Sequence, residues 1–572
     1  MNDIPRTEHP NPQFERNDWT NLNGVWEFEI DYGKSGIERE FYKRGSFNDK
    51  IIVPFCPESE LSGVGCKDFM AAVWYRRTIE LTEKQLDGRI ILHFGAVDYE
   101  TVVYINHKEV GRHFGGYTSF SFDITEFAFE GENVITVCAI DDVRSGRQPS
   151  GKQSDRYNSY DCSYTRTTGI WQTVWLEYVP NKYIKNVRFY PDVNNCKVSV
   201  QAELYGAGKL DIQTFYNGKN TGKASVYSDG GIVCLEIPLI EKHLWECGNG
   251  RLYDVMLRFE NDKVKSYFGL RNIFFDGVKF LLNGKSVFQR LVLDQGFYPK
   301  GIYTASTEDE LVRDIELSLA AGFNGARLHE KVFEPRFLYH CDRLGYMVWG
   351  EYANWGFDHT NADGLSGFLN EWREAVERDF NHPSIIAWCP FNETWDLSGR
   401  PQDDRILKAV YKETKALDFT RPCIDTSGHY HVLTDIFDVH DYDQNPKTFM
   451  ERYKKFECDE VCEYFDNRIS GRQRYRGEPF CISEYGGIQW DENGDSNGWG
   501  YGDAPKTKEE FLLRLKGLTD VLLDNSRIFG FCYTQLYDVE QEINGLYTYQ
   551  RESKFDSMIL RKIIGRKAKI EE

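Results

Sequence analysis

Three patterns of hydrophobic and polar positions follow one another along the chain. Up to about residue 180, short runs of β-branched and aromatic residues, such as 89–94, 101–105 and 133–137, are separated by Asn, Asp and Gly at hairpin spacing. Helical periodicity is almost absent from this part of the chain. The pattern predicts an all-β sandwich, or jelly roll, over residues 1–180.

A second β-rich segment spans residues 181–276. The stretches 198–204 and 251–259 alternate apolar and polar residues, as strands with one buried face do. A length of roughly 95 residues suits an immunoglobulin-like β-sandwich. No Cys pair supports this assignment, which rests on the size of the segment and its number of strands.

From residue 277 to residue 572, predicted strands and helices alternate. Thr307–Glu310 reads as a helix capping box, Leu311, Ile315 and Leu319 form one apolar stripe, and Gly322 is placed to end that helix. Strands are predicted at 323–328, 346–351, 385–392 and 528–535, and helices at about 366–380 and after 507. Repeated βα units over about 290 residues predict a (β/α)8 TIM barrel. A doubly wound sheet is the alternative, but no Gly-rich phosphate fingerprint follows a predicted strand.

Composition and charge exclude several classes of partner. The 572 residues carry a formal net charge of −20, which disfavours both nucleic acid and anionic membrane surfaces. No stretch approaches the roughly 18 apolar residues of a membrane span, and the N-terminus lacks an apolar signal core. The 14 Cys are scattered without metal-ligand spacing, which suggests reduced thiols and a cytoplasmic location, or a periplasmic one after removal of a signal peptide.

Polar and charged residues gather where the predicted barrel strands end. These are Arg327, His329, Glu351, Asn392–Glu393, His440–Asp441–Tyr442, Ser483–Glu484–Tyr485 and Thr534–Gln535. Because active sites of barrels of this kind lie at the C-terminal ends of the strands, we expect these side chains to converge. Each one alone is more often a solvated loop residue or an ion-pair partner, so only their joint placement points to a site.

Two glutamates at the ends of different strands are what retaining glycoside hydrolysis requires. One carboxylate attacks the anomeric carbon while the other donates a proton and then acts as a base, with the two carboxyl groups about 5–5.5 Å apart. A tyrosine hydroxyl that donates to Glu484, from the adjacent Tyr485 or from Tyr442 at another strand end, would favour the ionised form that a nucleophile needs. The amide of Asn392 can bond the 2-hydroxyl of the sugar, and Trp355 can stack on its face. We therefore expect Glu484 to be the nucleophile and Glu393 the acid/base.

The chain resembles glycoside hydrolase family 2, the β-galactosidases, β-glucuronidases and β-mannosidases. Residues 381–393 are similar to the acid/base signature of that family, ending at Glu393, and residues 482–486 to its nucleophile signature, with Glu484. Further similar stretches are 22–27, 74–77, 168–176, 244–245, 267–271, 322–327, 339–342 and 345–351. The resemblance implies a jelly roll, an immunoglobulin-like domain, a (β/α)8 barrel, retaining exo-β-glycoside hydrolysis and a homo-oligomer, either dimer or tetramer.

Departures from the family pattern bear on the substrate. Glu542 and Asn544 stand where β-glucuronidases carry an Asn-x-Lys pair that grips the sugar carboxylate, and an acidic residue there would repel a uronate. Arg327 and Lys331 could supply a different cationic grip. Residues 354–359 match the metal site of large β-galactosidases poorly, so we predict no required metal and no cofactor.

The function predicted from the sequence is hydrolysis of terminal non-reducing β-linked sugars, with β-galactosidase activity first. β-Galacturonidase and β-glucuronidase activities are the alternatives within this class, and a non-catalytic carbohydrate-binding protein is the alternative outside it. The residues expected to bind the sugar are Asn392, Tyr442, Arg327, His329, Lys331, Trp355 and Gln535.

Overall fold

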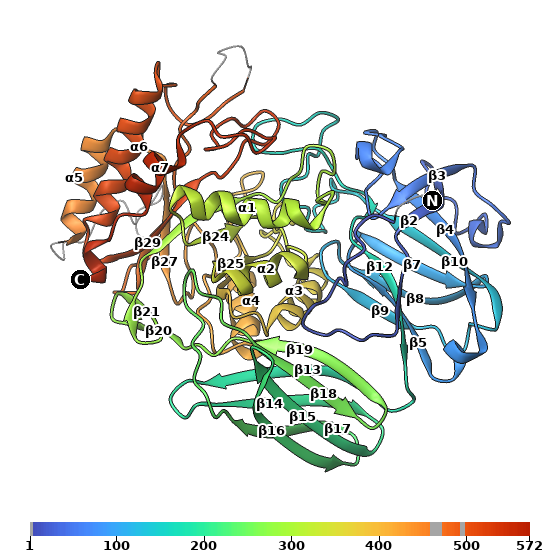
Figure 1. Ribbon diagram of the computed structural model, residues 1–572. Helices are drawn as coiled ribbons and strands as arrows, with labels where there is room; N and C mark the ends of the chain where they lie inside the picture. Colours follow the sequence, from blue (N-terminus) through green and yellow to red (C-terminus); the bar gives the residue numbers. More distant parts are fainter. Residues whose placement is uncertain (1–3, 458–471, 492–497) are drawn as a thin grey trace.

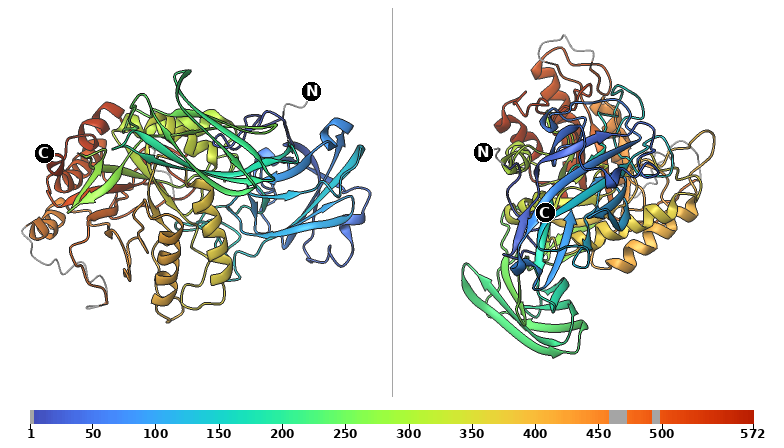
Figure 2. Two further views of the ribbon diagram at one scale, coloured as in Figure 1. Left: turned by 90° about the horizontal axis from the view of Figure 1, so that it is seen from below. Right: turned by 90° about the vertical axis from the view of Figure 1, so that its right-hand side faces the viewer.

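Three units built on separate sheets make up the fold (Figure 1). The structure is a computed structural model, and it describes residues 4–457, 472–491 and 498–572. The N-terminal sandwich and the helices α5, α6 and α7 lie at opposite ends of the molecule, as the left view of Figure 2 also shows. Within the described residues, no helix combines the length and the apolar character needed to cross a membrane.

The N-terminal unit is an antiparallel β-sandwich. One sheet has the order β1 (Trp19–Asn21), β12 (Val174–Val179), β5 (Arg89–Phe94) and β9 (Phe120–Asp123). The other has the order β3 (Asp49–Val53), β2 (Gly24–Ile30), β4 (Ala72–Leu81), β10 (Gly131–Ile140), β7 (Glu100–Ile105) and β8 (Lys108–Phe114). A short pair, β6 (Val97–Asp98) and β11 (Gly169–Ile170), completes it. Buried apolar side chains of both sheets fill the space between them, as the strand pattern predicted.

The second unit is a seven-stranded sandwich, as expected for an immunoglobulin-like domain. One sheet has the order β13 (Tyr183–Asp192), β14 (Lys197–Tyr205) and β17 (Gly231–Pro238). The other has the order β16 (Lys219–Ser228), β15 (Gly208–Tyr216), β18 (Tyr253–Phe259) and β19 (Asp262–Phe268). Strands β14 and β18 bury alternate residues, so the alternation in the sequence did mark one buried face.

The third unit is a curled parallel sheet surrounded by helices. A small sheet of β20 (Ile273–Asp276), β21 (Lys279–Leu282) and β22 (Lys285–Ser286) leads into it. The parallel strands have the order β26 (Ile385–Cys389), β25 (Met347–Glu351), β24 (Gly325–Leu328), β23 (Gln289–Asp294), β29 (Ile528–Thr534), β28 (Phe480–Gly486) and β27 (Phe437–Asp441). The helices are α1 (Glu308–Ala321), α2 (Pro335–Leu344), α3 (Leu365–Asp379), α4 (Asp404–Leu417), α5 (Pro446–Glu457), α6 (Lys508–Leu523) and α7 (Ser557–Ile564).

The eighth barrel position is a segment that pairs only in isolated bridges. Between β26 and β27, the parallel bridges Trp388–Cys423 and Asn392–Ser427 bring residues 423–427 alongside β26. The sheet of named strands therefore has seven members, and residues 423–427 take the place of an eighth, with no helix in the described stretch between them and β27. This segment places Ser427 beside Glu393, whose amide donates to the carbonyl of Ser427 at 2.9 Å.

Helix ends follow the sequence closely, with one correction. Gly322 caps α1 at φ 102°, a left-handed conformation that glycine adopts without strain. The capping box predicted at the N-terminus of α1 does not form its expected hydrogen bonds. The Thr307 side chain makes no capping bond, and the Glu310 carboxylate accepts from the amide of Ser306 at 2.7 Å instead. The helix begins as predicted because the acidic first turn still satisfies an amide donor there.

A long connection of the N-terminal unit reaches the barrel. Between β10 and β11, the amide of Ser150 donates to the carbonyl of Trp355 at 2.7 Å, and that of Gly151 donates to the carbonyl of Ala353 at 3.2 Å. Gly151 has φ +55°, and a Cβ there would lie 2.3 Å from the carbonyl oxygen of Glu330. A glycine is thus required for this close approach, which sets the next residue, Lys152, against the barrel mouth.

Candidate active site at the ends of the parallel strands

Two buried glutamates meet at the carboxyl ends of β26 and β28. One carboxylate oxygen of Glu393, one of Glu484 and a ring nitrogen of His440 all lie within 4.8 Å of one another. The side chains of Glu393 and Glu484 are 18% and 5% exposed. Retaining hydrolysis needs carboxyl groups about 5–5.5 Å apart, and the approach of these two oxygens to within 4.8 Å is compatible with that spacing. The two glutamates therefore lie side by side at one end of the sheet, the arrangement on which the sequence hypothesis depends.

The backbone of Glu393 is held in an unusual conformation. Its φ is 47°, in the left-handed region, which costs a non-glycine residue on the order of 1–3 kcal/mol. The carbonyl of Glu393 accepts from the amide of Trp395 at 2.7 Å, and the indole of Trp395 donates to Glu393 Oε2 at 3.2 Å. These bonds aim the carboxylate at Glu484 instead of at the solvent beyond the strand.

Arg327, at the end of β24, is a fully buried hub. Its Nε donates to Glu351 Oε1 at 2.5 Å, its Nη1 to Glu484 Oε1 at 3.0 Å, and its Nη2 to Asn392 Oδ1 at 2.9 Å. Burial opposes ionisation of Glu351, but Arg327 and His329 bring the pKa of Glu351 down to about 2. Because Arg327 already donates to these three side chains and to the carbonyl of Ser483 at 2.9 Å, it holds Glu484 in place and is not a free grip for a substrate carboxylate.

Tyr442 donates to the other carboxylate oxygen of Glu484. Its hydroxyl lies 2.5 Å from Glu484 Oε2 and 3.0 Å from Thr534 Oγ1, and the ring of Tyr501 stacks on it at 3.5 Å. Burial and the charge of Glu484 raise the pKa of Tyr442 well above its ordinary value, so the phenol remains a donor at neutral pH. Both oxygens of Glu484 are thus held by donors.

Two histidines differ in charge within this site. His329 Nδ1 lies 3.0 Å from Glu351 Oε2, and burial lowers the pKa of His329, which keeps it neutral. His440 Nδ1 lies 2.6 Å from Glu393 Oε1. Burial alone would lower the pKa of His440, but Glu484 and Glu393 raise it. Burial alone would raise the pKa of Glu393, but His440 brings it down to about 2.

Two of the predicted sugar-binding amides have free donors. Asn392 Oδ1 accepts from Arg327, and Gln535 Oε1 accepts from Gln295 Nε2 at 2.7 Å. The Nδ2 of Asn392 and the Nε2 of Gln535 are buried and have no hydrogen-bond partner among the described residues. Buried donors without partners are costly, and the hydroxyl groups of a bound sugar are groups that could satisfy them.

Lys152 is a site residue that sequence reasoning missed. Its Nζ lies 4.2 Å from the ring centroid of Trp355, whose indole donates to the carbonyl of Asn392 at 3.2 Å. Burial alone would lower the pKa of Lys152, but Cys162, Glu542, Glu484 and Glu393 raise it, so the ammonium stays charged. No hydrogen-bond or ion-pair partner of this ammonium is found in residues 4–457, 472–491 and 498–572. Its position in a loop of the N-terminal unit left no signal in the sequence.

Glu542 faces the same site as an acidic wall. Its two oxygens accept from the hydroxyl of Tyr164 at 2.5 Å and from Asn544 Nδ2 at 2.9 Å. Burial raises the pKa of Glu542 above its ordinary value, and Lys152 opposes that shift. Glu542 and Asn544 thus bond each other, and the charge of Glu542 acts on Lys152 and Glu484.

Lys331 is the predicted residue that the structure does not bring into this group. Its ammonium donates to the carbonyls of Gly296 at 2.5 Å and of Tyr303 at 2.8 Å, and it lies 4.5 Å from the ring centroid of Tyr303. Burial lowers the pKa of Lys331 to about 7, and the acidic groups that act on it are Glu334, Asp294 and Asp314. The predicted pairing of Arg327 with Lys331 as a cationic grip does not form.

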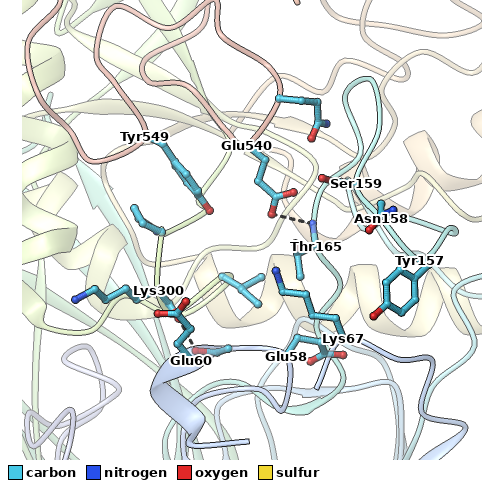
Figure 3. Close-up of a pocket in the computed structure, with 14 residues that line it drawn as sticks. Glu58, Glu60, Lys67, Tyr157, Asn158, Ser159, Thr165, Lys300, Glu540 and Tyr549 are labelled. Atoms are coloured by element: carbon cyan, nitrogen blue, oxygen red, sulfur yellow. Dashed lines mark hydrogen bonds between the residues drawn. The ribbon is translucent and has the colours of Figure 1, made fainter. Parts of the chain in front are cut away.

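A second pocket lies beside the acidic wall (Figure 3). It has a volume of about 460 Å³, and loops of the N-terminal unit and of the barrel both line it. Thr165, which follows Tyr164, and Glu540, which precedes Glu542 by two residues, both line it. The amide of Thr165 donates to the Glu540 carboxylate at 3.1 Å (Figure 3). Glu393 and Glu484 do not line this pocket, so it is separate from the carboxylate pair.

Sequence comparison with known proteins points to one family. Models of glycosyl hydrolases family 2 match residues 60–180 as its sugar binding domain, residues 182–271 as its central domain and residues 276–499 as its TIM barrel domain. The chain is 27% identical over 430 residues to a β-galactosidase of Thermoanaerobacter pseudethanolicus, covering 68% of this chain and 54% of that protein. It is 24% identical over 615 residues to a β-glucuronidase of Felis catus, covering 94% of this chain and 89% of that protein. The chain thus spans about half the length of that β-galactosidase.

Solved structures share the fold over nearly the whole chain. A β-glucuronidase from Ruminococcus gnavus in complex with an N1-substituted uronic isofagomine superposes with a TM-score of 0.80 at 18% identity, covering 98% of this chain and all of that one. A β-glucuronidase of an uncultured Clostridium species gives a TM-score of 0.78 at 20% identity, covering 96% and 99%. At these identities, the likeness establishes the three-unit architecture and nothing finer.

Proposed function

The chain belongs to glycosyl hydrolase family 2, and we propose that it is a retaining exo-β-glycosidase acting on terminal β-linked sugars. The observation that supports this most directly is the pair formed by Glu393 and Glu484, whose carboxylate oxygens approach within 4.8 Å. A pair at this spacing has room for the anomeric centre of one sugar but no room for the extra water that an inverting enzyme places between its carboxylates.

In the first step, Glu484 attacks the anomeric carbon. The Arg327 guanidinium and the Tyr442 hydroxyl bind its two oxygens and hold the carboxylate in line. Glu393 gives its proton to the glycosidic oxygen, so the aglycone leaves as a neutral alcohol and the sugar remains esterified to Glu484. The Nδ2 of Asn392 is free to bond the 2-hydroxyl, a contact expected to strengthen in the transition state.

In the second step, Glu393 acts as a base. It takes a proton from a water molecule, which attacks the anomeric carbon and releases Glu484 as a carboxylate. Two inversions at one carbon leave the product in the β configuration. The same residue can serve as acid and base because it loses one proton in the first step and regains one in the second.

A terminal β-galactoside is the substrate that we propose first. Glu542 supports a neutral sugar, since a buried carboxylate at this wall repels a uronate and can accept sugar hydroxyls. The similarity to β-galactosidases over 68% of the chain is consistent with this choice.

A β-hexuronide is a second candidate because of Lys152. A charged ammonium that faces the carboxylate pair without an ion-pair partner among the described residues can bind the carboxylate of a uronic acid. The β-glucuronidase similarity over 94% of the chain fits this alternative. Lys152 and Glu542 thus favour opposite substrates, and only turnover can rank them.

Product stereochemistry and a panel of substrates test the proposal. The purified protein is incubated with nitrophenyl β-galactoside, β-galacturonide and β-glucuronide, and the first sugar product is followed by proton NMR. We expect a β-configured first product and a loss of several orders of magnitude in kcat for Glu484→Gln. A first product of α configuration, or a Glu484→Gln variant as active as the wild type, contradicts the mechanism. Turnover of the uronides alone contradicts the galactoside assignment.

A further inference from the structure

His440 lies between the two catalytic carboxylates at the end of β27. Its Nδ1 is 2.6 Å from Glu393 Oε1 and 3.3 Å from Glu484 Oε2. An ionised carboxylate only accepts hydrogen bonds, so this nitrogen carries a hydrogen in the unliganded site, where both glutamates are charged. The shorter contact directs that hydrogen toward Glu393.

The other nitrogen of His440 faces a serine that is already committed as a donor. His440 Nε2 lies 3.1 Å from the hydroxyl of Ser427, and that hydroxyl donates to Asp438 Oδ2 at 2.6 Å. With the serine hydrogen on Asp438, the serine oxygen can accept from Nε2–H, and a hydrogen on both ring nitrogens makes the ring an imidazolium. Nη1 of Arg327, 3.4 Å from Nε2, opposes this charge. Glu393, Glu484 and the buried Asp438 favour it.

The ring has little freedom to turn away from Glu393. Gly428 lies directly against it, and a Cβ at that position would come within 2.3 Å of the ring. Ser427 ends the segment that fills the eighth barrel position and Gly428 follows it, so the barrel itself fixes the imidazole. A group held this tightly between two reacting carboxylates is placed to exchange a proton with them.

In the unliganded site, the neighbouring charges keep the Glu393 carboxyl group ionised, so the proposed general acid lacks its proton. The pKa of Glu393 is about 2, against burial, because His440 bonds and faces it. At neutral pH, the proton that a general acid must supply therefore resides on the imidazole and not on the carboxyl group. The proposed mechanism needs this proton on Glu393 when the glycosidic bond breaks.

We propose that His440 is a positioning residue that stores the proton which Glu393 delivers to the leaving group and takes it back after each turnover. This inference rests on the proposed glycosidase function and adds a carrier to its acid/base step. Attack by Glu484 replaces its negative charge by a neutral ester, which removes one of the two charges that hold the proton on His440. The imidazolium is then less favoured, and the proton moves from Nδ1 to Glu393 Oε1.

The proton balance closes over one turnover. Nδ1–H breaks as Glu393 O–H forms, and Glu393 O–H breaks as the aglycone oxygen takes the proton, which leaves neutral His440 and ionised Glu393. In the second step, a water proton passes to Glu393 while the hydroxyl bonds the anomeric carbon and the ester bond to Glu484 breaks. That proton then returns to Nδ1, so one water is consumed and both residues regain their starting charge.

This role of His440 is tested by comparing leaving groups that need a proton with leaving groups that do not. The variant His440→Asn is assayed with the phenyl and the 2,4-dinitrophenyl β-glycosides of the sugar that the panel identifies. We expect kcat/KM to fall about 100-fold for the phenyl glycoside and less than about 5-fold for the dinitrophenyl glycoside, which departs without protonation. The alkaline limb of kcat/KM for the phenyl glycoside should also move to lower pH, because Glu393 must then hold the proton alone.

Controls separate this inference from the function on which it rests. Glu393→Gln should show the same dependence on leaving group, and its absence there contradicts the proposed acid itself. Equal losses of His440→Asn on both glycosides, or an unmoved alkaline limb, overturn the role of His440 alone. Ser427→Ala keeps the imidazole and should shift the limb in the same direction, which covers a His440→Asn variant that does not fold. His93→Asn, a histidine paired with Glu177 in the N-terminal unit, should leave both rates unchanged.

Discussion

The phenolic oxygen of Tyr442 lies 2.5 Å from Oε2 of Glu484, on the side of the carboxylate opposite to Arg327. A hydrogen bond to a charged group contributes about 1.5–3 kcal/mol, which corresponds to roughly 10–100-fold in rate. Tyr442→Phe should therefore lower kcat by about that factor, as steady-state kinetics on the preferred nitrophenyl glycoside would measure. Tyr485→Phe is the matched control, because the Tyr485 hydroxyl bonds Thr519 and should leave kcat unchanged.

Arg327 should prove essential to both stability and activity. Removing one partner of a buried ion pair leaves the other charge uncompensated and costs about 3–5 kcal/mol. We expect Arg327→Met to be inactive and to unfold at clearly lower temperature in calorimetry, since Glu351 and Glu484 both lose their cation. Adding Glu351→Gln should restore part of the thermal stability but no activity. A double variant less stable than Arg327→Met contradicts the pairing.

Replacement of Lys152 should change specificity more than catalysis. Lys152→Met keeps the length of the side chain and its packing on Trp355 but removes the charge. If the natural sugar is a uronide, kcat/KM for uronides should fall about 100-fold with little change for the galactoside, as expected for loss of a charged hydrogen bond. If the natural sugar is a galactoside, kcat/KM for the uronides and for the galactoside should each change by less than about 10-fold. An equal large loss on all substrates would show that Lys152 instead supports the carboxylate pair.

The glycine that brings Lys152 to the site should not tolerate a side chain. Gly151→Ala places a Cβ 2.3 Å from the carbonyl oxygen of Glu330 at φ +55°, so the loop must move away from the barrel. Gly146→Ala, in the same loop at φ +69°, meets only a side-chain carbon of Asp358 at 3.9 Å. We expect Gly151→Ala to raise KM and lower thermal stability, and Gly146→Ala to show only the cost of a left-handed alanine, about 1 kcal/mol. Similar behaviour of the two variants contradicts the docking.

Acid should destabilise the protein partly through Glu351. Its pKa is about 2 in the folded protein against an ordinary 4.5, so it contributes about 3 kcal/mol of stability above pH 4.5. Because the folded pKa is depressed, this contribution is lost as pH falls from 4.5 toward 2. Urea unfolding between pH 7 and pH 3 should show a smaller loss for Glu351→Gln than for the wild type. Parallel losses would mean that other carboxylates dominate.

Local patterns in the sequence were enough to predict the architecture and the neighbouring positions of Glu393 and Glu484. Alternating apolar and polar positions in 198–204 and 251–259 mark strands, because side chains two residues apart lie on the same face of a strand. Helix and strand alternation after residue 277 predicts the barrel, and Glu393 and Glu484 follow buried strands whose ends must meet at one edge. Only the bonds of the capping box at Thr307 differ, because side-chain reach within one turn depends on rotamers.

What the tertiary structure decided is which charges meet. Lys331 follows β24 but bonds backbone carbonyls away from Glu393 and Glu484, while Lys152, from a loop of the N-terminal unit, packs on Trp355 and feels the charge of both glutamates. Arg327 donates to three side chains, and His440 contacts both glutamates, relationships that no spacing along the chain encodes. The physical reason is that burial periodicity is local, whereas the partner of a charge is fixed by how segments hundreds of residues apart pack and exclude water between them.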